Sequence, residues 1–334
     1  MKIAVLSPVA WQTPPKHYGP WEQIASNITE GLVSAGLEVT LFATGDSLTS
    51  GKLAAVIERG YEEDRQQDAK VCECLHISHL MERSSEFDLI HNNFDFLPLT
   101  YSKLIKTPMV TTIHGFSSQK IVPVYKKYND TSHYVSISNA DRNEDLKYVA
   151  TVYNGLNVDE FQFTEQPDDY LLFFGRLHHD KGAAEAIKIA KQARKRLIMA
   201  GIIQDERYFE ERIKPFLNDD IQFIGHAGPD KRNELLGKAT ALLHPINFAE
   251  PFGMSVAESM LCGTPVIAFN KGSMPELIKH KETGFLVNTI NEAVEAASEL
   301  HNIDRQDCRK WAASQFSKER MVADYIKVYK QILS

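Results

Sequence analysis

Two glutamates eight residues apart carry the strongest chemical signal in the sequence. Glu250 and Glu258 lie in segment 244–266, HPINFAEPFGMSVAESMLCGTPV, which indicates a strand end, a loop, a helix and the next strand. If the helix begins near Phe252 or Gly253, its first amides have no intrahelical partner, and the helix dipole favours negative charge there. Glycine also lets an anion approach the backbone closely. The segment therefore predicts an anion site on the amides of Gly253, Met254 and Ser255.

The two carboxylates suit a polyol beside that anion better than the anion itself. Glu258 is expected about one helical turn, roughly 5 Å, beyond the amides. A carboxylate repels phosphate, but it accepts hydrogen bonds from both hydroxyls of a diol such as ribose. Glu250, before the helix, would face a second polyol on the far side of the phosphates. Together these residues predict a nucleoside diphosphate joined to a sugar as the ligand.

Two cations on one loop form the second signal. Arg176 follows an expected strand, and Lys181 comes five residues later. Cations at this point would stabilise a departing diphosphate, on which charge grows as the glycosidic bond breaks. Arginine offers a planar fork and lysine a compact charge. In isolation, solvated loop cations are the better interpretation, but beside the carboxylate pair we interpret the two as a diphosphate site.

Short apolar runs alternate with helical patterns along both halves of the chain, which predicts parallel sheets covered by helices. A helix over 21–36 carries apolar side chains on one face and ends at Gly36. The polar stretch 154–169 interrupts the alternation and marks a domain boundary. Helical spacing of apolar residues after Phe316 predicts a terminal helix. The expected strands are residues 2–7, 38–43, 88–91, 109–114, 134–137, 151–153, 170–174, 197–200, 221–224, 241–244 and 265–268.

Ligands of such sheets bind at the carboxyl ends of the strands, so two doubly wound domains predict a cleft lined by loops from both. The loop after the first strand, SPVAWQTPPKHYGPWE, lacks G-x-G-x-x-G, and the sequence has no Walker loop. Nicotinamide-dependent hydride transfer and P-loop kinase chemistry thus lose their support. Segment 91–95, HNNFD, has no carboxylates spaced for Mg²⁺, so we expect no catalytic metal.

Composition describes an ordinary globular chain of 334 residues, 43% hydrophobic and 24% charged, long enough for two cores. The formal net charge of -7 lacks the basic field usual for nucleic-acid partners. Cys72 and Cys74 are too close in sequence for a zinc or redox knuckle, so reduced thiols are expected. No apolar stretch approaches the roughly 20 residues that span a bilayer, and the N-terminus has no signal-peptide pattern. We therefore expect a cytoplasmic protein without a transmembrane segment.

Further short motifs accompany these residues in both halves of the chain. Those in the second half are Arg176-x4-Lys181-Gly182, Glu250-Pro-Phe-Gly-x4-Glu258, Gly263-x-Pro265-Val266, Pro275-Glu276 and Gly284-Phe285-Leu286-Val287. Those in the first half are the Gly19 loop before Glu22, Thr112-Ile113-His114-Gly115, and Asn154-Gly155 leading into Phe161. Together they resemble the retaining family-four glycosyltransferases of GT-B fold over nearly the whole chain. The paired glutamates with the Arg/Lys loop are the specific part of the resemblance.

The resemblance implies an α/β architecture of the GT-B type, with two facing Rossmann-like, doubly wound domains and a cleft between them. Residues 1–154 would form the acceptor domain and residues 155–316 the nucleotide-sugar donor domain. A C-terminal helix, 317–334, would pack back on the first domain.

The resemblance also implies roles for individual residues. Glu258 would bind the nucleotide ribose, Glu250 the donor sugar, and Arg176 with Lys181 the diphosphate, while His114 would reach the donor sugar from the first domain. Backbone contacts to the donor are expected at Gly19, Phe252, Gly253, Met254 and Ser255. Relatives often have two adjacent glycines where this chain has Gly19-Pro20. Since proline lacks an amide hydrogen, only Gly19 offers its amide on that side.

The activity that the resemblance implies is transfer of a hexose from a nucleoside-diphosphate sugar to an acceptor hydroxyl. Configuration would be retained and no divalent metal or other cofactor required; a UDP-sugar is favoured, with GDP-mannose as the alternative donor. A nucleotide-sugar epimerase or hydrolase of the same fold and a non-catalytic nucleotide-sugar-binding protein remain alternatives. The acceptor would be a saccharide, a lipid-linked compound or a small metabolite, held by loops 9–20 and 116–128. No nucleic-acid partner is expected, and the sequence leaves the linkage and the oligomeric state open.

Overall fold

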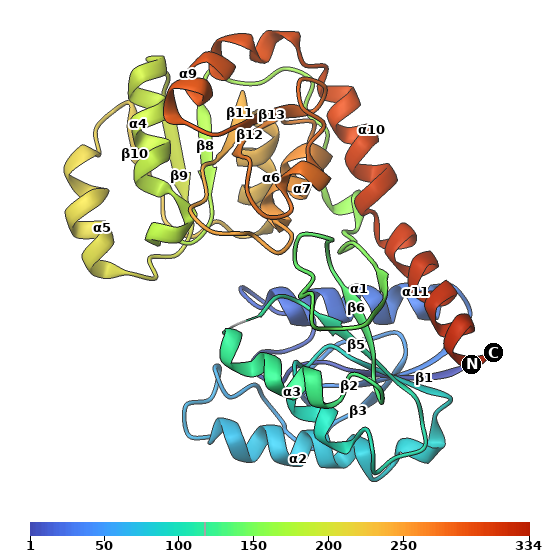
Figure 1. Ribbon diagram of the computed structural model, residues 1–334. Helices are drawn as coiled ribbons and strands as arrows, with labels where there is room; N and C mark the ends of the chain where they lie inside the picture. Colours follow the sequence, from blue (N-terminus) through green and yellow to red (C-terminus); the bar gives the residue numbers. More distant parts are fainter. Residues whose placement is uncertain (117) are drawn as a thin grey trace. The chain divides into compact units, whose positions relative to one another are not determined.

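The computed structural model describes residues 1–116 and 118–334, which form two compact units (Figure 1). The first unit comprises Met1–Leu156 with Lys318–Ser334, and the second comprises Asn157–Ser317. The division after Leu156 lies two residues beyond the boundary expected from the sequence. Each unit contains one parallel sheet with helices packed against it.

The sheet of the first unit has the strand order β3-β2-β1-β4-β5-β6-β7, and its described pairs are all parallel. The chain begins in the middle at β1, moves outward to β3 and returns to β4 on the other side of β1. The loops after β1 and β4 therefore leave the sheet in opposite directions, which opens a crevice at their carboxyl ends. The strands are β1 (Lys2–Leu6), β2 (Glu38–Phe42), β3 (Lys52–Ala54), β4 (Leu89–Asn92), β5 (Met109–Ile113), β6 (His133–Ser136) and β7 (Tyr148–Thr151).

Helix α1 (Pro20–Ser34) shows how local sequence sets the elements of this unit. Gly19 caps the helix and Pro20 occupies its first turn, where the missing amide hydrogen costs nothing. Ile24, Ile28 and Leu32 repeat at helical spacing and are fully buried. The other helices of the unit are α2 (Ala69–Met81), α3 (Val122–Lys127) and α11 (Lys318–Leu333).

The terminal helix α11 packs against α1, so the end of the chain completes the first unit. In Figure 1 the two helices lie side by side. Contact is close because Gly31 of α1 has no side chain where Val322 of α11 approaches. The Tyr325 hydroxyl is hydrogen-bonded to Thr112 Oγ1 at 2.7 Å, and the Tyr329 hydroxyl to His91 Nδ1 at 2.6 Å. These buried polar contacts fix the register of α11 on the sheet.

The second unit repeats the doubly wound pattern with the order β10-β9-β8-β11-β12-β13. Its switch point lies between β8 and β11, so the loops after these two strands flank one crevice. The strands are β8 (Leu171–Phe174), β9 (Leu197–Ala200), β10 (Ile221–Phe223), β11 (Ala241–His244), β12 (Val266–Phe269) and β13 (Gly284–Val287). The helices are α4 (Ala183–Ala193), α5 (Glu206–Arg212), α6 (Pro229–Lys238), α7 (Met254–Leu261), α8 (Met274–Leu277), α9 (Ile290–Glu299) and α10 (Arg305–Phe316).

The α/β doubly wound fold class predicted from the sequence is confirmed, but some strands differ from the residue ranges expected for them. The strand expected at 151–153 is wrong: β7 covers Tyr148–Thr151, an edge strand whose side chains are all half-buried, so its apolar signal is weak. Strands β3 and β13 were not predicted: two of the three residues of β3 are exposed, and β13 is a four-residue strand at the edge of its sheet. Trp21 was placed on the buried face of its helix but is only half-buried.

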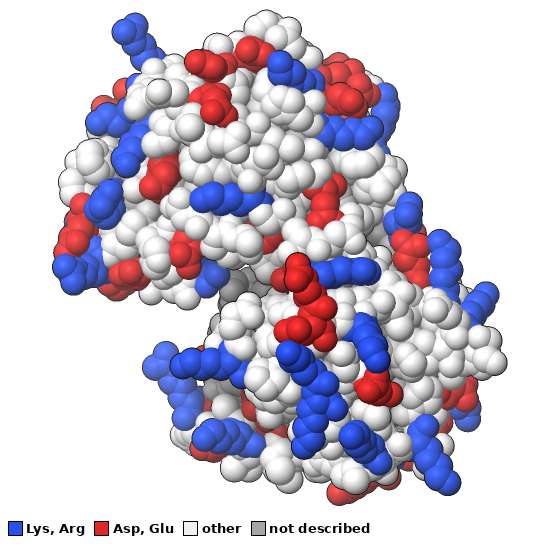
Figure 2. All heavy atoms as spheres, viewed as in Figure 1, with Lys and Arg blue, Asp and Glu red and all other residues white. Residues whose placement is uncertain are grey.

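The surface carries acidic and basic side chains interspersed over the face of the second unit drawn in Figure 2. Cys72, Cys74, Cys262 and Cys308 are free thiols. Within the described part of the chain, no helix is long and apolar enough to cross a membrane.

Candidate functional site

The two strongest sequence signals meet at the switch point of the second unit. The loop after β8 carries Arg176 and Lys181, and the loop after β11 carries Glu250. Asn247 joins the two loops: its amide donates to the Asp180 carbonyl at 2.7 Å and its side chain donates to the His179 carbonyl at 3.1 Å. At Gly182, whose φ is 75°, a Cβ would lie 1.9 Å from the Pro245 carbonyl oxygen, so the packing of the loops requires glycine.

Lys181 and Glu250 form an ion pair in this loop cluster, which the sequence had assigned to separate roles. The side chains are 16% and 13% exposed, so water screens the pair little. The ammonium also lies 4.8 Å from the centre of the Phe248 ring. His244, at the end of β11, places its Nε2 3.8 Å from the Glu250 carboxylate. Burial, with the nearby lysine charge, lowers the pKa of His244 to about 3, so this imidazole is neutral.

The anion site expected at the N-terminus of α7 has the geometry that anion binding needs. Helix α7 begins at Met254, one residue beyond the expected start, with Gly253 as its cap at a φ of 91°. A Cβ at Gly253 would meet the Met274 side chain at 2.7 Å. Among the described residues, no backbone acceptor is found for the amides of Gly253, Met254 and Ser255. Phe252 is buried before the cap, and its carbonyl accepts a hydrogen bond from the Ser273 hydroxyl at 2.7 Å.

Glu258 lies one turn into α7 and is paired with a residue that the sequence did not reveal. Arg232, from α6, donates from Nη1 to Glu258 Oε1 at 3.3 Å. The guanidinium also lies 4.9 Å from the centre of the Phe161 ring. Burial raises the pKa of Glu258, and the Arg232 charge opposes this shift. The pair therefore holds the Glu258 carboxyl group in a buried position, one turn beyond the first amides of α7.

Arg176 lies in the same loop as Lys181 but has a different partner. Its Nη1 donates to Gln204 Oε1 at 2.5 Å, in the loop after β9. This hydrogen bond ties the guanidinium to the loop after β9, and it is separate from the Lys181–Glu250 ion pair.

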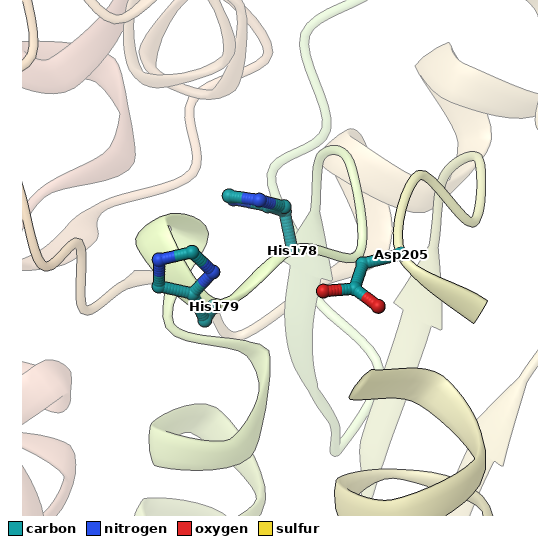
Figure 3. Close-up of side chains that lie close together, drawn as sticks. All are labelled: His178, His179 and Asp205. Atoms are coloured by element: carbon teal, nitrogen blue, oxygen red, sulfur yellow. The ribbon is translucent and has the colours of Figure 1, made fainter. Parts of the chain in front are cut away.

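Three side chains in and beside this loop could hold a metal ion. His178 and His179 lie in the loop after β8, and Asp205 caps α5; one potential ligand atom of each lies within 4.8 Å of the others (Figure 3). Each has competing partners: both histidines contact Asp180, at 3.3 and 2.9 Å, and Asp205 accepts from the Tyr208 amide at 2.9 Å. The sequence did not single out this group.

The predicted residues of the first unit, Gly19 and His114, lie near its own switch point. His114 stacks on Trp21 with ring centres 5.6 Å apart, and its Nε2 is hydrogen-bonded to Asn93 Oδ1 at 3.1 Å. Burial lowers the pKa of His114 to about 3, so the ring is neutral. Gly19, with a φ of 150°, caps α1 directly above the Glu22 carboxyl group.

A cavity of about 480 Å³ opens between the loops after β1 and β4 of the first unit. Aromatic rings and three carboxyl groups, those of Glu22, Glu73 and Asp95, line it. Burial raises the pKa of Glu22 to about 7 and that of Asp95 to about 6. Residues 9–20 of the first expected acceptor loop contribute to this wall; the second, 116–128, includes residue 117, which lies outside the described residues.

Sequence reasoning missed Arg232, His244 and Glu73; it named Glu22 only as part of a motif and considered Asp95 only for metal binding. His244 carried a usable signal, because it ends an expected strand just as His114 follows one. Arg232 carried none: it lies on a polar helix, and its role as the partner of Glu258 exists only in the folded chain.

Comparison with known proteins defines the class. Residues 157–314, the second unit almost entirely, match the family model described as "Glycosyl transferases group 1". An uncharacterized glycosyltransferase of Methanocaldococcus jannaschii is 23% identical over 86% of this chain and 85% of its own length. Residues 157–314 therefore form a domain of the group 1 glycosyltransferase family.

Solved structures share the fold of this protein over its full length. Sucrose-phosphate synthase from Thermosynechococcus elongatus matches with a TM-score of 0.80 and 18% identity, covering 99% of both chains. HepE of Anabaena in complex with UDP-glucose matches with a TM-score of 0.72 and 19% identity, covering 99% of this chain and 100% of its own. These structural matches show a GT-B fold for the chain, and the family model assigns residues 157–314 to the group 1 glycosyltransferases.

Proposed function

We propose that this glycosyltransferase moves a hexose from a nucleoside-diphosphate sugar to an acceptor hydroxyl with retention of anomeric configuration. The observation that carries the proposal is the loop cluster of the second unit. It places the Lys181–Glu250 ion pair, the free amides at the start of α7 and the Glu258–Arg232 pair on adjacent loops and turns.

Each part of the cluster suits one part of such a donor. The amides of Gly253, Met254 and Ser255 would bind an anion, and Lys181 and Arg176, both in the loop after β8, would add positive charge for the diphosphate. Glu258, one turn further along α7, would accept the ribose hydroxyls. Glu250, whose carboxylate is oriented by Lys181, would accept hydroxyls of the sugar. A UDP-sugar is the favoured donor, since HepE, a protein of the same fold, was crystallised with UDP-glucose; GDP-mannose is the alternative.

The proposal needs no enzymic base. Glu250 and Glu258 are both engaged in ion pairs, and His244 and His114 are buried, neutral rings. An oxygen of the departing diphosphate would take the acceptor proton on the face where the acceptor arrives, which gives retention. His114 would contact the donor sugar as a hydrogen-bonding group.

Positive charge from Lys181 and Arg176, with the α7 amides, would replace the divalent ion that other transferases use on the diphosphate. On this basis we predict activity without a metal. If that prediction is wrong, the His178–His179–Asp205 group is where an ion would bind. The cytoplasmic location expected from the sequence also stays a prediction.

Calorimetric titration with UDP, GDP and ADP, followed by transfer assays with their hexose derivatives, tests the proposal. We expect one nucleotide to bind and its hexose derivative to be consumed only with an acceptor present. Consumption that yields free sugar at the same rate without acceptor would indicate a hydrolase. Binding without consumption, across a broad acceptor panel, would indicate a non-catalytic nucleotide-sugar-binding protein.

A further inference from the structure

The cavity at the switch point of the first unit has no role in the argument so far. It lies between the loop after β1, the starts of α1 and α2, and the turn after β4. Its volume of about 480 Å³ is within the range of small-molecule sites and suits one or two sugar rings. The cavity is formed by the first unit alone.

Charge in this cavity has one sign. Glu22, Glu73 and Asp95 line it, and among the described residues no lysine, arginine or histidine does. Burial raises the pKa values of Asp95 and of Tyr61, and carboxylates raise them further: Glu73 acts on Asp95, and Glu73, Glu22 and Glu62 act on Tyr61. A phosphate or carboxylate on a ligand would therefore meet like charge without any cation to offset it.

The carboxyl groups are held in place and keep capacity to accept hydrogen bonds. Tyr61 donates its hydroxyl to Glu73 Oε1 at 3.2 Å, and Tyr125 donates to Asp95 Oδ1 at 2.5 Å. Glu22 is 3% exposed and accepts from the Trp11 amide. A carboxylate offers about four lone-pair positions, so each retains free acceptor positions for ligand hydroxyls.

Backbone strain marks the same wall. Asp95 has a φ of 112°, which side-chain-bearing residues rarely adopt. Asn92 holds this turn: its Nδ2 donates to the Asp95 carbonyl at 2.9 Å, and its Oδ1 accepts from the Phe94 amide at 2.9 Å. Strain of this kind persists where the surrounding structure fixes a functional conformation.

Flat aromatic rings form the remaining walls. Trp11, Trp21 and Phe94 line the cavity, and Trp21 also stacks on His114. At Gly19 a Cβ would lie 2.8 Å from Glu22 Oε2, so a side chain there would press against this carboxyl group. Rings give a sugar's C–H faces an apolar surface, while the carboxylates receive its hydroxyls.

We propose that this cavity binds the acceptor and that the acceptor is a saccharide without an anionic group, as opposed to a sugar phosphate or a carboxylic acid. The inference rests on the proposed transfer function for its acceptor role. It selects one charge class among the saccharide, lipid-linked and small-metabolite acceptors that the sequence leaves open.

Binding can be measured without donor by tryptophan fluorescence, since Trp11 and Trp21 line the cavity. The probes are methyl α-glucoside, methyl α-mannoside and glucosamine, compared with glucose 6-phosphate and glucuronate. We expect at least one of the first three to bind at least tenfold more tightly than both anions. Glu73→Gln and Asp95→Asn should weaken that binding at least fivefold and reduce the discrimination against glucose 6-phosphate, with UDP affinity unchanged. Glu63→Gln, at an exposed glutamate outside the cavity, is the matched control and should change neither.

Donor-dependent transfer assays with the same sugars separate the two proposals. Transfer that prefers the anionic sugars, or cavity variants that behave like Glu63→Gln, would overturn the inference and leave transfer itself intact. A lack of fluorescence response to every sugar would also overturn it. Saccharide binding without transfer from any donor would overturn the acceptor role together with the proposed function.

Discussion

Replacing Glu258 tests the donor site at the point where the structure adds most to the sequence. The carboxylate is 8% exposed, lies one turn into α7 and is paired with Arg232 at 3.3 Å. If it accepts ribose hydroxyls, Glu258→Ala removes a hydrogen bond to a charged group, which contributes about 1.5 to 3 kcal/mol. At about 1.4 kcal/mol per factor of ten, UDP affinity should fall by roughly 10- to 150-fold.

The partner of Glu258 allows the binding effect to be separated from a structural one. Arg232 is 22% exposed in its side chain and lies against the Phe161 ring, so it can be rehydrated when its carboxylate is removed. Glu258→Ala should therefore leave the melting temperature nearly unchanged while UDP affinity falls. Glu282→Ala, at an exposed glutamate of the same unit, is the control.

Isothermal titration of UDP into each variant, with thermal unfolding in parallel, provides the measurement. UDP affinity within twofold of wild type in a stably folded Glu258→Ala would refute the ribose contact. A fall in affinity that only accompanies a fall in melting temperature would assign Glu258 a structural role.

Four further results are expected. Glu250→Ala should leave UDP affinity unchanged or tighter, because it releases Lys181 from its ion pair, while turnover falls steeply in kinetic assays. A loss of UDP affinity equal to that of Glu258→Ala, measured by titration, would contradict the role assigned to Glu250. The initial rate should survive excess EDTA, and a collapse that added Mg²⁺ or Mn²⁺ restores would reveal a metal site. Gly31→Ala should lower the free energy of unfolding by about 1 to 3 kcal/mol, because its Cβ would lie 2.3 Å from Val322, and Val322→Ala in the same chain should recover much of the loss in denaturant unfolding. Burial raises the pKa of Glu22 from 4.5 to about 7, so ionisation of its carboxyl group destabilises the fold as the pH rises between these values. Glu22→Gln should therefore raise the free energy of unfolding by on the order of 3 kcal/mol at pH 8.5, and this gain should shrink toward pH 4.5. If denaturant unfolding shows no gain, the carboxyl group is well solvated.

Buried parallel strands were predictable because they are continuous apolar runs. Residues 197–200 and 241–244 coincide with β9 and β11, whose side chains are almost all buried. Edge strands gave weaker signals: β3 is three residues long and β7 is half-buried throughout. A strand with one wet face loses the run of apolar residues on which the prediction depends.

The candidate donor site was predictable as a set of residues but not as a set of pairs. Lys181 and Glu250 were both singled out, yet their ion pair depends on loop packing through Asn247 and Gly182. Arg232 was invisible because nothing in a polar helix marks the residue that will face a buried carboxylate. The roles assigned to these residues stay predictions that the variants above test.

Polar residues after β4 were read for metal binding alone, which concealed another possibility. Among the described residues, Asp95 belongs to no group of side chains that could hold a metal ion. It lines the first-unit cavity instead, and its backbone conformation is strained. The aromatic wall opposite it cannot be read from the local sequence, because Trp11 and Trp21 come from the loop after β1 and the start of α1.

The stereochemistry of transfer tests the central claim most directly. Proton NMR can follow a reaction of an α-linked UDP-hexose, or GDP-mannose, with an uncharged saccharide acceptor and report the anomeric configuration of the product. Retaining transfer predicts release of the nucleoside diphosphate together with an α-linked product at the same rate. A β-linked product would contradict retention, and nucleoside diphosphate released with only free hexose would contradict transfer.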